Sequence, residues 1–269
     1  MKALRVCFIN LLIIIMGVYM LFQLSAGQCM AAVPQIPRKM DITEAIAELG
    51  DMAGKNKEFQ DIVDHRERYP DDMLIALCNN PEMYEFVRDY PALKGNIDPE
   101  LTDEELSKKC PLLLQWDERW GYASYGNNMV GLSGCGPTCL SMASICLTGD
   151  KSMTPDVIAA YSMNNGYYVD GVGTAWKLLS EGASHFGIKA KEIALDEEIM
   201  KVYLDRGCPI ICSVGPGDFT AAGHFIVIYG YDEKGFKVND PNCIIRSKES
   251  WPYERIAGQI RILWAYSRG

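Results

Sequence analysis

Four apolar strand patterns close the chain, and they constrain its fold more than any other feature of the sequence. They are "PIICSVG" (209–215), "HFIVIYGYD" (224–232), "GFKVND" (235–240) and "QIRILWAYS" (259–267), and helical patterns precede them. Helices that come first and strands that come afterwards are typical of an α+β domain, in which the helices cover an antiparallel sheet. The sequence therefore predicts an α+β fold with its sheet near the C-terminus.

The helical patterns fall into two groups, one on each side of Pro111. Helical spacing of apolar residues predicts helices in "DITEAIAELGDMAGK" (41–55) and in "YPDDMLIALCNNPEMYEFVRDYP" (69–91), the latter as two short pieces. The charged stretch that follows them is expected to be a connector. We therefore expect a helical appendage with its linker over residues 33–109 and an α+β domain over residues 110–269.

The second group contains four predicted helices. The first runs from about 135 to 148 and ends at Gly149. The second begins after Thr154, which we expect to act as its cap, with Pro155 in the first turn. The other two lie in "GTAWKLLSEGASHFG" and "DEEIMKVYLDRG".

The N-terminus has the order of a secretory signal over residues 1–32. Lys2 and Arg5 precede the apolar run "VCFINLLIIIMGVYMLF" (6–22), and small and polar residues follow it. The run is long for a signal and slightly short for a spanning helix of ~20 residues, so a retained anchor is the alternative to cleavage. Whether the segment is cleaved or retained, its basic end is expected to stay on the cytoplasmic side of the membrane. The expected location is extracellular, either secreted or anchored to the outer face of the cytoplasmic membrane.

Composition excludes several classes of partner. The formal net charge is −9, and the sequence has no basic stripe, phosphate loop or dinucleotide fingerprint, so neither nucleic acid nor a cofactor is expected. The ten cysteines are scattered without a CxxC pair, which argues against a metal site. Most of them are expected to be small buried residues. The sequence does not indicate an oligomeric state.

The stretch "SGCGPTCLSM" (133–142) contains the candidate nucleophile. Cys135 stands at a loop-to-helix junction, where free backbone N–H groups and the positive end of the helix dipole favour a thiolate. The glycines on either side are expected to leave room for a substrate backbone. Cys139 lies one turn further into the helix, where burial would keep it neutral. The alternative is that both cysteines are ordinary packing residues.

One of the three histidines is placed to act as a base. His65 lies in a charged helical stretch, and His185 lies near a helix end, where surface or capping roles are expected. His224 opens a buried strand, which puts its imidazole at the mouth of the sheet. A buried structural histidine is the alternative there.

Asp240, at the end of the next strand, is the candidate partner of His224. A symmetric turn between the two strands would place Asp240 opposite Val227, so the pair can meet only through a β-bulge or a shifted register. Asn239 is the alternative partner, because an amide can also orient an imidazole.

This order of cysteine on a helix, histidine on a strand and acid on the next strand resembles the papain-fold cysteine peptidases. Among them the chain is most similar to the bacteriocin-processing, double-glycine peptidases and their relatives. The resemblance covers residues 111–269 and is carried by "LLLQWDERWG", "YG", "SGCGPTCLSM", "GHFIVIYGYD" and "VNDP". It implies that Cys135 is the nucleophile, His224 the base and acid, and Asp240 the orienting group.

The resemblance also implies a glutamine that binds the oxyanion, usually six residues before the cysteine. Met129 stands at that position, which is a departure from the family pattern. Gln115 is the best candidate, because the inserted stretch after it could return it to the site, and Asn127 and Asn128 are rivals. The aromatic residues of "QWDERWGYASYG" are expected to anchor the core and loops rather than line a groove.

The function implied is that of an exported thiol peptidase, which hydrolyses peptide bonds through an acyl-enzyme and takes a peptide or protein as substrate. Two alternatives stay open: a catalytically silent papain-fold binding module, and a thiol amidase or transferase that acts on cell-wall or other amide bonds. A reactive Cys135 would separate the first alternative from an enzyme.

Overall fold

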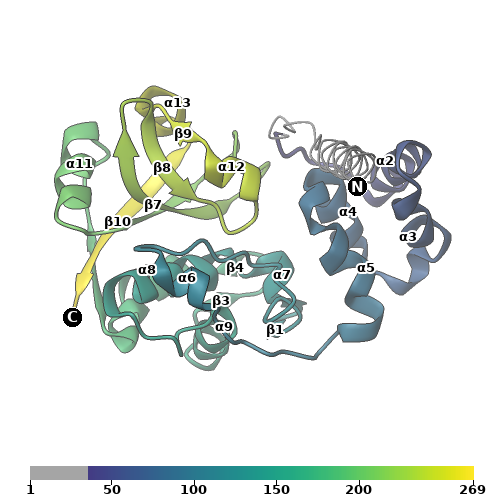
Figure 1. The fold of residues 1–269 in the computed structure, drawn as a ribbon, viewed down its shortest axis with the longest axis horizontal. Helices are drawn as coiled ribbons and strands as arrows, with labels where there is room; N and C mark the ends of the chain where they lie inside the picture. The colour runs from purple at the N-terminus through teal and green to yellow at the C-terminus, as the bar shows by residue number, and fades with distance from the viewer. Residues whose placement is uncertain (1–35) are drawn as a thin grey trace, which may run out of the picture. The chain divides into compact units, whose positions relative to one another are not determined.

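A six-stranded antiparallel sheet lies in the C-terminal part of the protein (Figure 1). The structure, a computed structural model, describes residues 36–269, so the predicted export segment lies outside it. The strand order is β5-β10-β6-β7-β8-β9. The strands are β5 (Ile188–Glu192), β6 (Ile210–Val214), β7 (His224–Asp232), β8 (Gly235–Asn239), β9 (Ser250–Trp251) and β10 (Ile260–Arg268). The α+β class and the four predicted strands are confirmed, while β5 and β9 were not predicted.

Alternation of side chains along the strands divides the core into two layers. Ile211, Val227 and Trp264 face one layer, together with the apolar side chains of α8 (Cys135–Thr148). Their neighbours in the strands face the other layer, which is covered by α11 (Glu197–Asp205) and α13 (Tyr253–Ala257). Both sheet faces are thus buried, which explains why β6 and β7 read as continuous apolar runs.

Helix α8 is buried around most of its circumference. Its polar side chains are satisfied internally: Thr138 donates to the carbonyl oxygen of Gly134 at 2.8 Å, and Ser144 donates to that of Phe186 at 3.0 Å. The helix ends at Gly149, whose φ of 73° is the left-handed conformation that favours glycine. The start and end of α8 are as predicted, so the start of a rigid, buried helix carries Cys135.

The remaining helices agree with the sequence patterns in outline and differ in detail. Thr154 does precede α9 (Pro155–Asn164), but its side chain makes no capping hydrogen bond. The third predicted helix is divided at Glu181 into α10 (Trp176–Ser180) and a 3-10 turn over Gly182–Phe186. The predicted connector contains the short helix α6 (Asp103–Ser107), which a Thr102–Glu105 capping box begins.

Small elements complete the chain. They are the hairpins β1 (Ser124–Tyr125) with β2 (Asn128–Met129) and β3 (Tyr168–Val169) with β4 (Gly173–Thr174), and the short helices α7 (Val130–Ser133) and α12 (Ile244–Lys248). Within residues 36–269 no helix is both long and apolar enough to cross a membrane.

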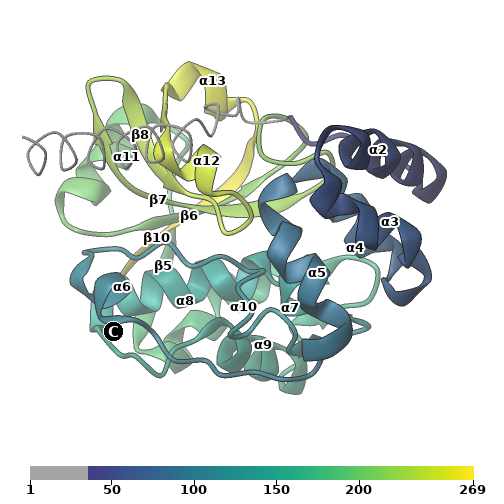
Figure 2. The same ribbon diagram turned by 45° about the vertical axis from the view of Figure 1, so that its right-hand side comes forward.

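The helical appendage is built around a hydrophobic core that Tyr122 of the α+β part also joins. Its helices are α2 (Ile42–Lys55), α3 (Gln60–Asp64), α4 (Asp71–Asn79) and α5 (Tyr84–Leu93), and α5 runs beside α7 in Figure 2. Phe86 of α5 stacks on Tyr122 with ring centroids 4.6 Å apart. A Cβ atom on Gly131 would lie 2.3 Å from the ring of Phe86, so only glycine permits this close approach. The appendage therefore packs directly on the α+β part.

All eight cysteines in the described part of the chain are free thiols, and most are buried, as predicted. Burial raises the pKa of Cys139 well above its usual value, so this thiol stays neutral. Cys139 is fully buried in α8, whereas Cys135 is only half-buried. The structure thus separates the two cysteines of the "SGCGPTCLSM" stretch.

Candidate active site

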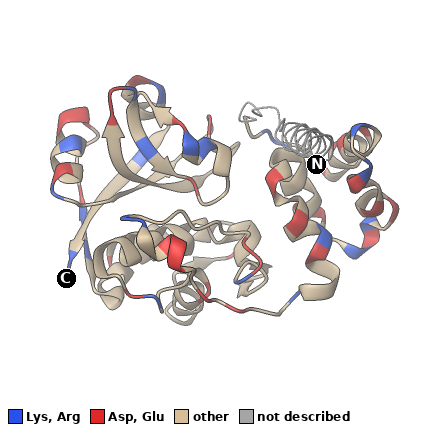
Figure 3. Ribbon diagram, viewed as in Figure 1, with Lys and Arg blue, Asp and Glu red and all other residues tan. Residues whose placement is uncertain are grey.

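A cleft of about 650 Å³ contains both Cys135 and His224. It lies where α7, the start of α8 and β4 meet the start of β7. None of the described residues that line it is Asp, Glu, Lys or Arg. In Figure 3 charged residues of both signs are spread over the appendage helices, whereas α7 and β4 carry none. His224 is thus the one titratable nitrogen base among the described residues of the lining.

Cys135 is the first residue of α8, and Pro137 lies in the first turn, as predicted. The flanking glycines have a different reason from the one expected. A Cβ atom on Gly134 would lie 2.5 Å from the carbonyl oxygen of Val130, and one on Gly136 would lie 2.6 Å from the side chain of Thr174. Both glycines thus permit a close approach of neighbouring groups within the protein.

His224 and Asp240 meet, with Nε2 of the imidazole 2.8 Å from Oδ1 of the carboxylate. A β-bulge makes this contact possible. The register of β7 and β8 shifts between Ile228 and Gly230, so that Val227 pairs with Asn239 instead of lying opposite Asp240. Because alternate residues share a face, the shift brings Asp240 onto the side of the sheet to which His224 belongs. The predicted need for a bulge is confirmed.

Burial and two neighbouring side chains determine the charge of His224. Burial by itself would lower the pKa of His224, but the negative charge of Asp240 and hydrogen bonds to Asp240 and Cys135 raise it to about 9. Since Nε2 faces Asp240, Nδ1 is the ring nitrogen left for Cys135. At neutral pH the imidazole is therefore protonated, and its positive charge lies beside the Cys135 thiol.

Arg246 is a part of the site that the sequence analysis missed. Its side chain is 1% exposed, and its Nε donates to Oδ2 of Asp240 at 2.6 Å. Burial would raise the pKa of Asp240, but the charges of Arg246 and His224 hold it below its usual value. The sequence does contain a signal for Arg246, which directly follows the apolar stretch of residues 243–245. A cation buried among apolar residues needs a buried anion as partner.

Backbone groups complete the environment of Asp240. The N–H of Asn242 donates to Oδ1 at 2.8 Å, and the N–H of Asp240 itself donates to the hydroxyl of Ser247 at 2.9 Å. The carboxylate, which is 0% exposed, thus has defined donors on both oxygens. We call residues 240–243 the acid loop, because they carry Asp240 and lead directly into α12.

The structure places Gln115 in the same cleft as Cys135, although 20 positions separate them in the sequence. Its backbone N–H donates to Pro241 at 2.7 Å, and its Nε2 donates to the carbonyl oxygen of Gly131 at 3.0 Å. One amide hydrogen on Nε2 then remains for another acceptor. Its buried Oε1 has no hydrogen-bond partner among the described residues.

The rivals of Gln115 are committed elsewhere. The amide of Asn127 donates to Asp170 at 2.6 Å, and that of Asn128 donates to Asp72 in the appendage at 2.5 Å. Met129, at the position where the family glutamine is expected, is part of β2 and packs against the appendage core. Gln115 is therefore the best-placed of the three amide side chains.

The other candidates lie away from Cys135. Asn239 donates to the carbonyl oxygens of Cys110 and Pro111, so it ties β8 to the start of the α+β part and does not orient His224. His65 and His185 are exposed, and His185 stacks on Tyr161. The aromatic side chains Trp120, Tyr122 and Tyr125 are buried and absent from the cleft lining, as expected for core anchors.

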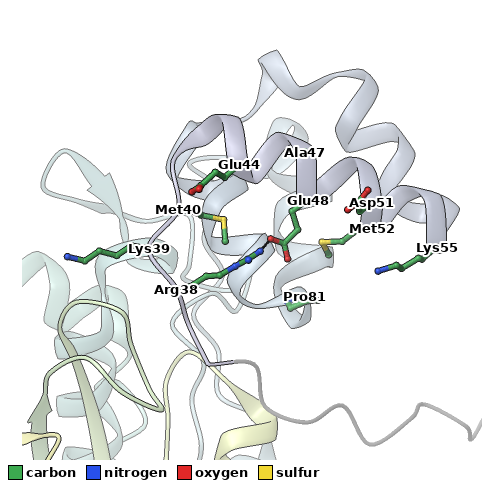
Figure 4. Close-up of a pocket in the computed structure, with 10 residues that line it drawn as sticks. All are labelled: Arg38, Lys39, Met40, Glu44, Ala47, Glu48, Asp51, Met52, Lys55 and Pro81. Atoms are coloured by element: carbon green, nitrogen blue, oxygen red, sulfur yellow. Dashed lines mark ion pairs between the residues drawn. The ribbon is translucent and has the colours of Figure 1, made fainter.

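A second cavity, of about 530 Å³, lies in the appendage (Figure 4). It surrounds the ion pair between Arg38 and Glu48 and is bordered by Met40, Met52 and Pro81. None of the candidate catalytic residues lines it. Within residues 36–269 no group of three or more His, Cys, Asp or Glu side chains is arranged to hold a metal ion.

The chain is similar to known peptidases over part of its length. Residues 107–269 match the family model described as Peptidase_C39 like family. A solved structure, the peptidase domain of Streptococcus ComA, a bi-functional ABC transporter involved in a quorum-sensing pathway, matches with 20% identity and a TM-score of 0.40. That match covers 51% of this chain and 93% of that domain. None of the curated proteins matches the chain.

The family match extends over more than half of the chain and includes the helix that bears Cys135, the strand that bears His224 and the loop that bears Asp240. A papain-like α+β fold and the order of these residues accord with it. The chain therefore belongs to the C39-like peptidase family and is a cysteine peptidase.

Proposed function

We propose that this peptidase cleaves peptide bonds with Cys135 as nucleophile, His224 as general acid and base, and Asp240 as the group that orients His224. The observation that carries the proposal is the contact series in one cleft: Cys135 next to His224, and His224 2.8 Å from Asp240. An activated thiol with a base that a third group orients is the arrangement that nucleophilic catalysis requires.

The reaction proceeds in two halves. The Cys135 thiolate attacks the carbonyl carbon of the peptide bond, and the C–N bond breaks as His224 gives its proton to the departing amine. A thioester between Cys135 and the acyl part of the substrate is left. Water then attacks this thioester and gives a proton to His224, and the C–S bond breaks, which restores the thiolate and releases a carboxylic acid.

Two donors would stabilise the negative oxygen that forms in each half. The backbone N–H of Cys135 has no partner within its own helix, because it is the first residue of α8. The remaining amide hydrogen of Gln115 is the second. Donors of this kind contribute about 10²- to 10³-fold to the rate when they are fixed in advance, and the buried position of Gln115 fixes its amide.

We further propose that the protein acts outside the cytoplasm, either secreted or held at the outer face of the membrane. The proposal rests on the charged, apolar and small-residue order of residues 1–32. N-terminal sequencing of the protein from fractionated cells tests it. Recovery of the full-length, unprocessed chain from the soluble cytoplasmic fraction would contradict it.

The proposed chemistry predicts a covalent intermediate. When the full-length protein is mixed with an activated ester of an uncharged peptide, mass spectrometry should find the acyl group on the peptide fragment that contains Cys135. Gln115→Ala should form the same adduct about 10²-fold more slowly, because one oxyanion donor is lost. A matched ester with acidic and basic residues beside the reacting carbonyl should acylate the wild type more slowly than the uncharged ester does, since none of the described residues that line the cleft is Asp, Glu, Lys or Arg. An adduct on another cysteine, with Cys135 unmodified, would overturn the proposal.

A further inference from the structure

We propose that the helical appendage is a working part of the active site, because its Glu82 is a positioning residue for catalysis that holds the acid loop and thereby orients His224. The inference rests on the proposed roles of Cys135, His224 and Asp240. It assigns a role to a segment that lies outside the matched family region of residues 107–269.

Glu82 binds the catalytic part through both of its carboxylate oxygens. Its Oε2 accepts a hydrogen bond from the N–H of Ile244 at 2.8 Å, and its Oε1 accepts one from the N–H of Ile245 at 3.1 Å. These are the first two residues of α12, whose N–H groups have no partner within the helix. Two charge-assisted bonds from one rigid carboxylate fix both the position and the rotation of α12.

Helix α12 in turn holds Asp240 at two points. Arg246 donates to its carboxylate at 2.6 Å, and Ser247 accepts from its backbone N–H at 2.9 Å. The next contact in the series is the 2.8 Å contact between Asp240 and His224. A displacement of α12 would therefore move the carboxylate away from the imidazole.

Asn80 forms a second connection between the appendage and the acid loop. Its side-chain amide donates to the carbonyl oxygen of Asn242, and its Oδ1 accepts from the N–H of Glu82 at 3.2 Å. Trp116, which follows Gln115, donates to the same carbonyl oxygen of Asn242 at 3.0 Å. One loop thus connects the appendage, the acid and the neighbour of the candidate oxyanion residue.

The appendage also borders the cleft itself. Ala76 and Asn79 of α4 and Met83, which follows Glu82, line the same cleft as Cys135. Asn80 is 4% exposed and Met83 is 1% exposed, so this contact region is packed like an interior. These contacts are those of a fixed wall of the active site, on the side where the acid loop lies.

The test compares Glu82→Ala and Glu82→Gln with Glu85→Ala in the full-length protein. Glu85 is an exposed neighbour of the same charge and serves as the matched control. Both Glu82 variants should lower kcat about 10-fold or more with a small change in KM, because misplaced catalytic groups lose orientation but not substrate binding. The alkaline limb of the kcat/KM profile should also move to lower pH, since Asp240 no longer supports the charge of His224. Glu85→Ala should match the wild type.

A double variant separates positioning from general weakening of the fold. In the Asp240→Asn background, Glu82→Gln should change kcat by less than about 2-fold, because the group through which Glu82 acts is already lost. Glu82→Gln keeps the size of the side chain, so it decides the question if Glu82→Ala does not fold. Unchanged kcat and an unmoved alkaline limb in Glu82→Gln, with Cys135→Ala inactive, would overturn this inference alone. Activity in Cys135→Ala would instead overturn the proposed function.

Discussion

Replacing Cys135 by alanine is expected to lower the kcat/KM of peptide hydrolysis by about 10⁴-fold or more, because Cys135 is the only thiol among the described residues that line the cleft. Loss of a nucleophile removes the reaction path itself, while the oxyanion donors and substrate binding remain. Steady-state hydrolysis of an uncharged peptide by purified full-length protein measures the effect. Thermal unfolding of the same sample should show little change, since Cys135 is only half-buried.

Cys139→Ala is the matched control. Cys139 lies in the same helix, is fully buried and is kept neutral by that burial, so it has no access to substrate. We expect this variant to keep its hydrolytic activity and to lose about 1–2 kcal/mol of stability from the space left behind. The opposite pattern, with Cys135→Ala active and Cys139→Ala inactive, would remove the assignment of the nucleophile.

Asp240 is expected to be the most costly single side chain to remove. Asp240→Ala would leave the buried charges of Arg246 and His224 without the carboxylate that compensates them, and breaking a buried charge pair costs about 3–5 kcal/mol. Urea unfolding of wild type and variant measures this loss. Asp240→Asn, which keeps the shape, should fold better but lower kcat by about 10²- to 10⁴-fold, because the amide no longer supports a protonated imidazole. An Asp240→Ala variant as stable as the wild type would contradict the view that Asp240 compensates the buried charges of Arg246 and His224.

The pH dependence of these proteins follows from His224. Its pKa rises from about 6.5 in the unfolded chain to about 9 in the folded protein, so the stability that its charge contributes is complete below about pH 6.5 and is lost as pH rises through about 9. Activity should decline over the same alkaline range as His224 loses its proton. In Asp240→Asn this decline should begin at lower pH, and an identical alkaline limb in both proteins would contradict the contact.

Local patterns in the sequence predicted the parts of the site that local structure determines. The helix that begins at Cys135 follows from its apolar periodicity and Gly149, and the strand that begins at His224 follows from a continuous apolar run. Even the bulge was predictable, because counting residues around the turn shows that a regular hairpin would keep Asp240 away from His224.

The parts that sequence reasoning missed depend on contacts between distant residues. Glu82 and Ile244 are 162 positions apart, and neither carries a pattern that points to the other. Arg246 gives a weak signal as a cation in an apolar run, but its partner could not be named before the acid loop was placed. The close packing of Gly134 against Val130 and of Gly136 against Thr174 was also missed, because the sequence does not show which residues lie beside these glycines.

The proposed mechanism depends on the pairing of a Cys135 thiolate with protonated His224, and the rate at which iodoacetamide alkylates Cys135 tests this pairing. Peptide mapping separates Cys135 from the other cysteines, and the rate is compared at about pH 6 and about pH 8 in wild type and His224→Ala. In the wild type, Cys135 should be alkylated nearly as fast at about pH 6 as at about pH 8, because the imidazolium stabilises the thiolate. His224→Ala should be slower there by about 10-fold or more. The same pH dependence in both proteins would contradict the activated pair and with it the proposed mechanism.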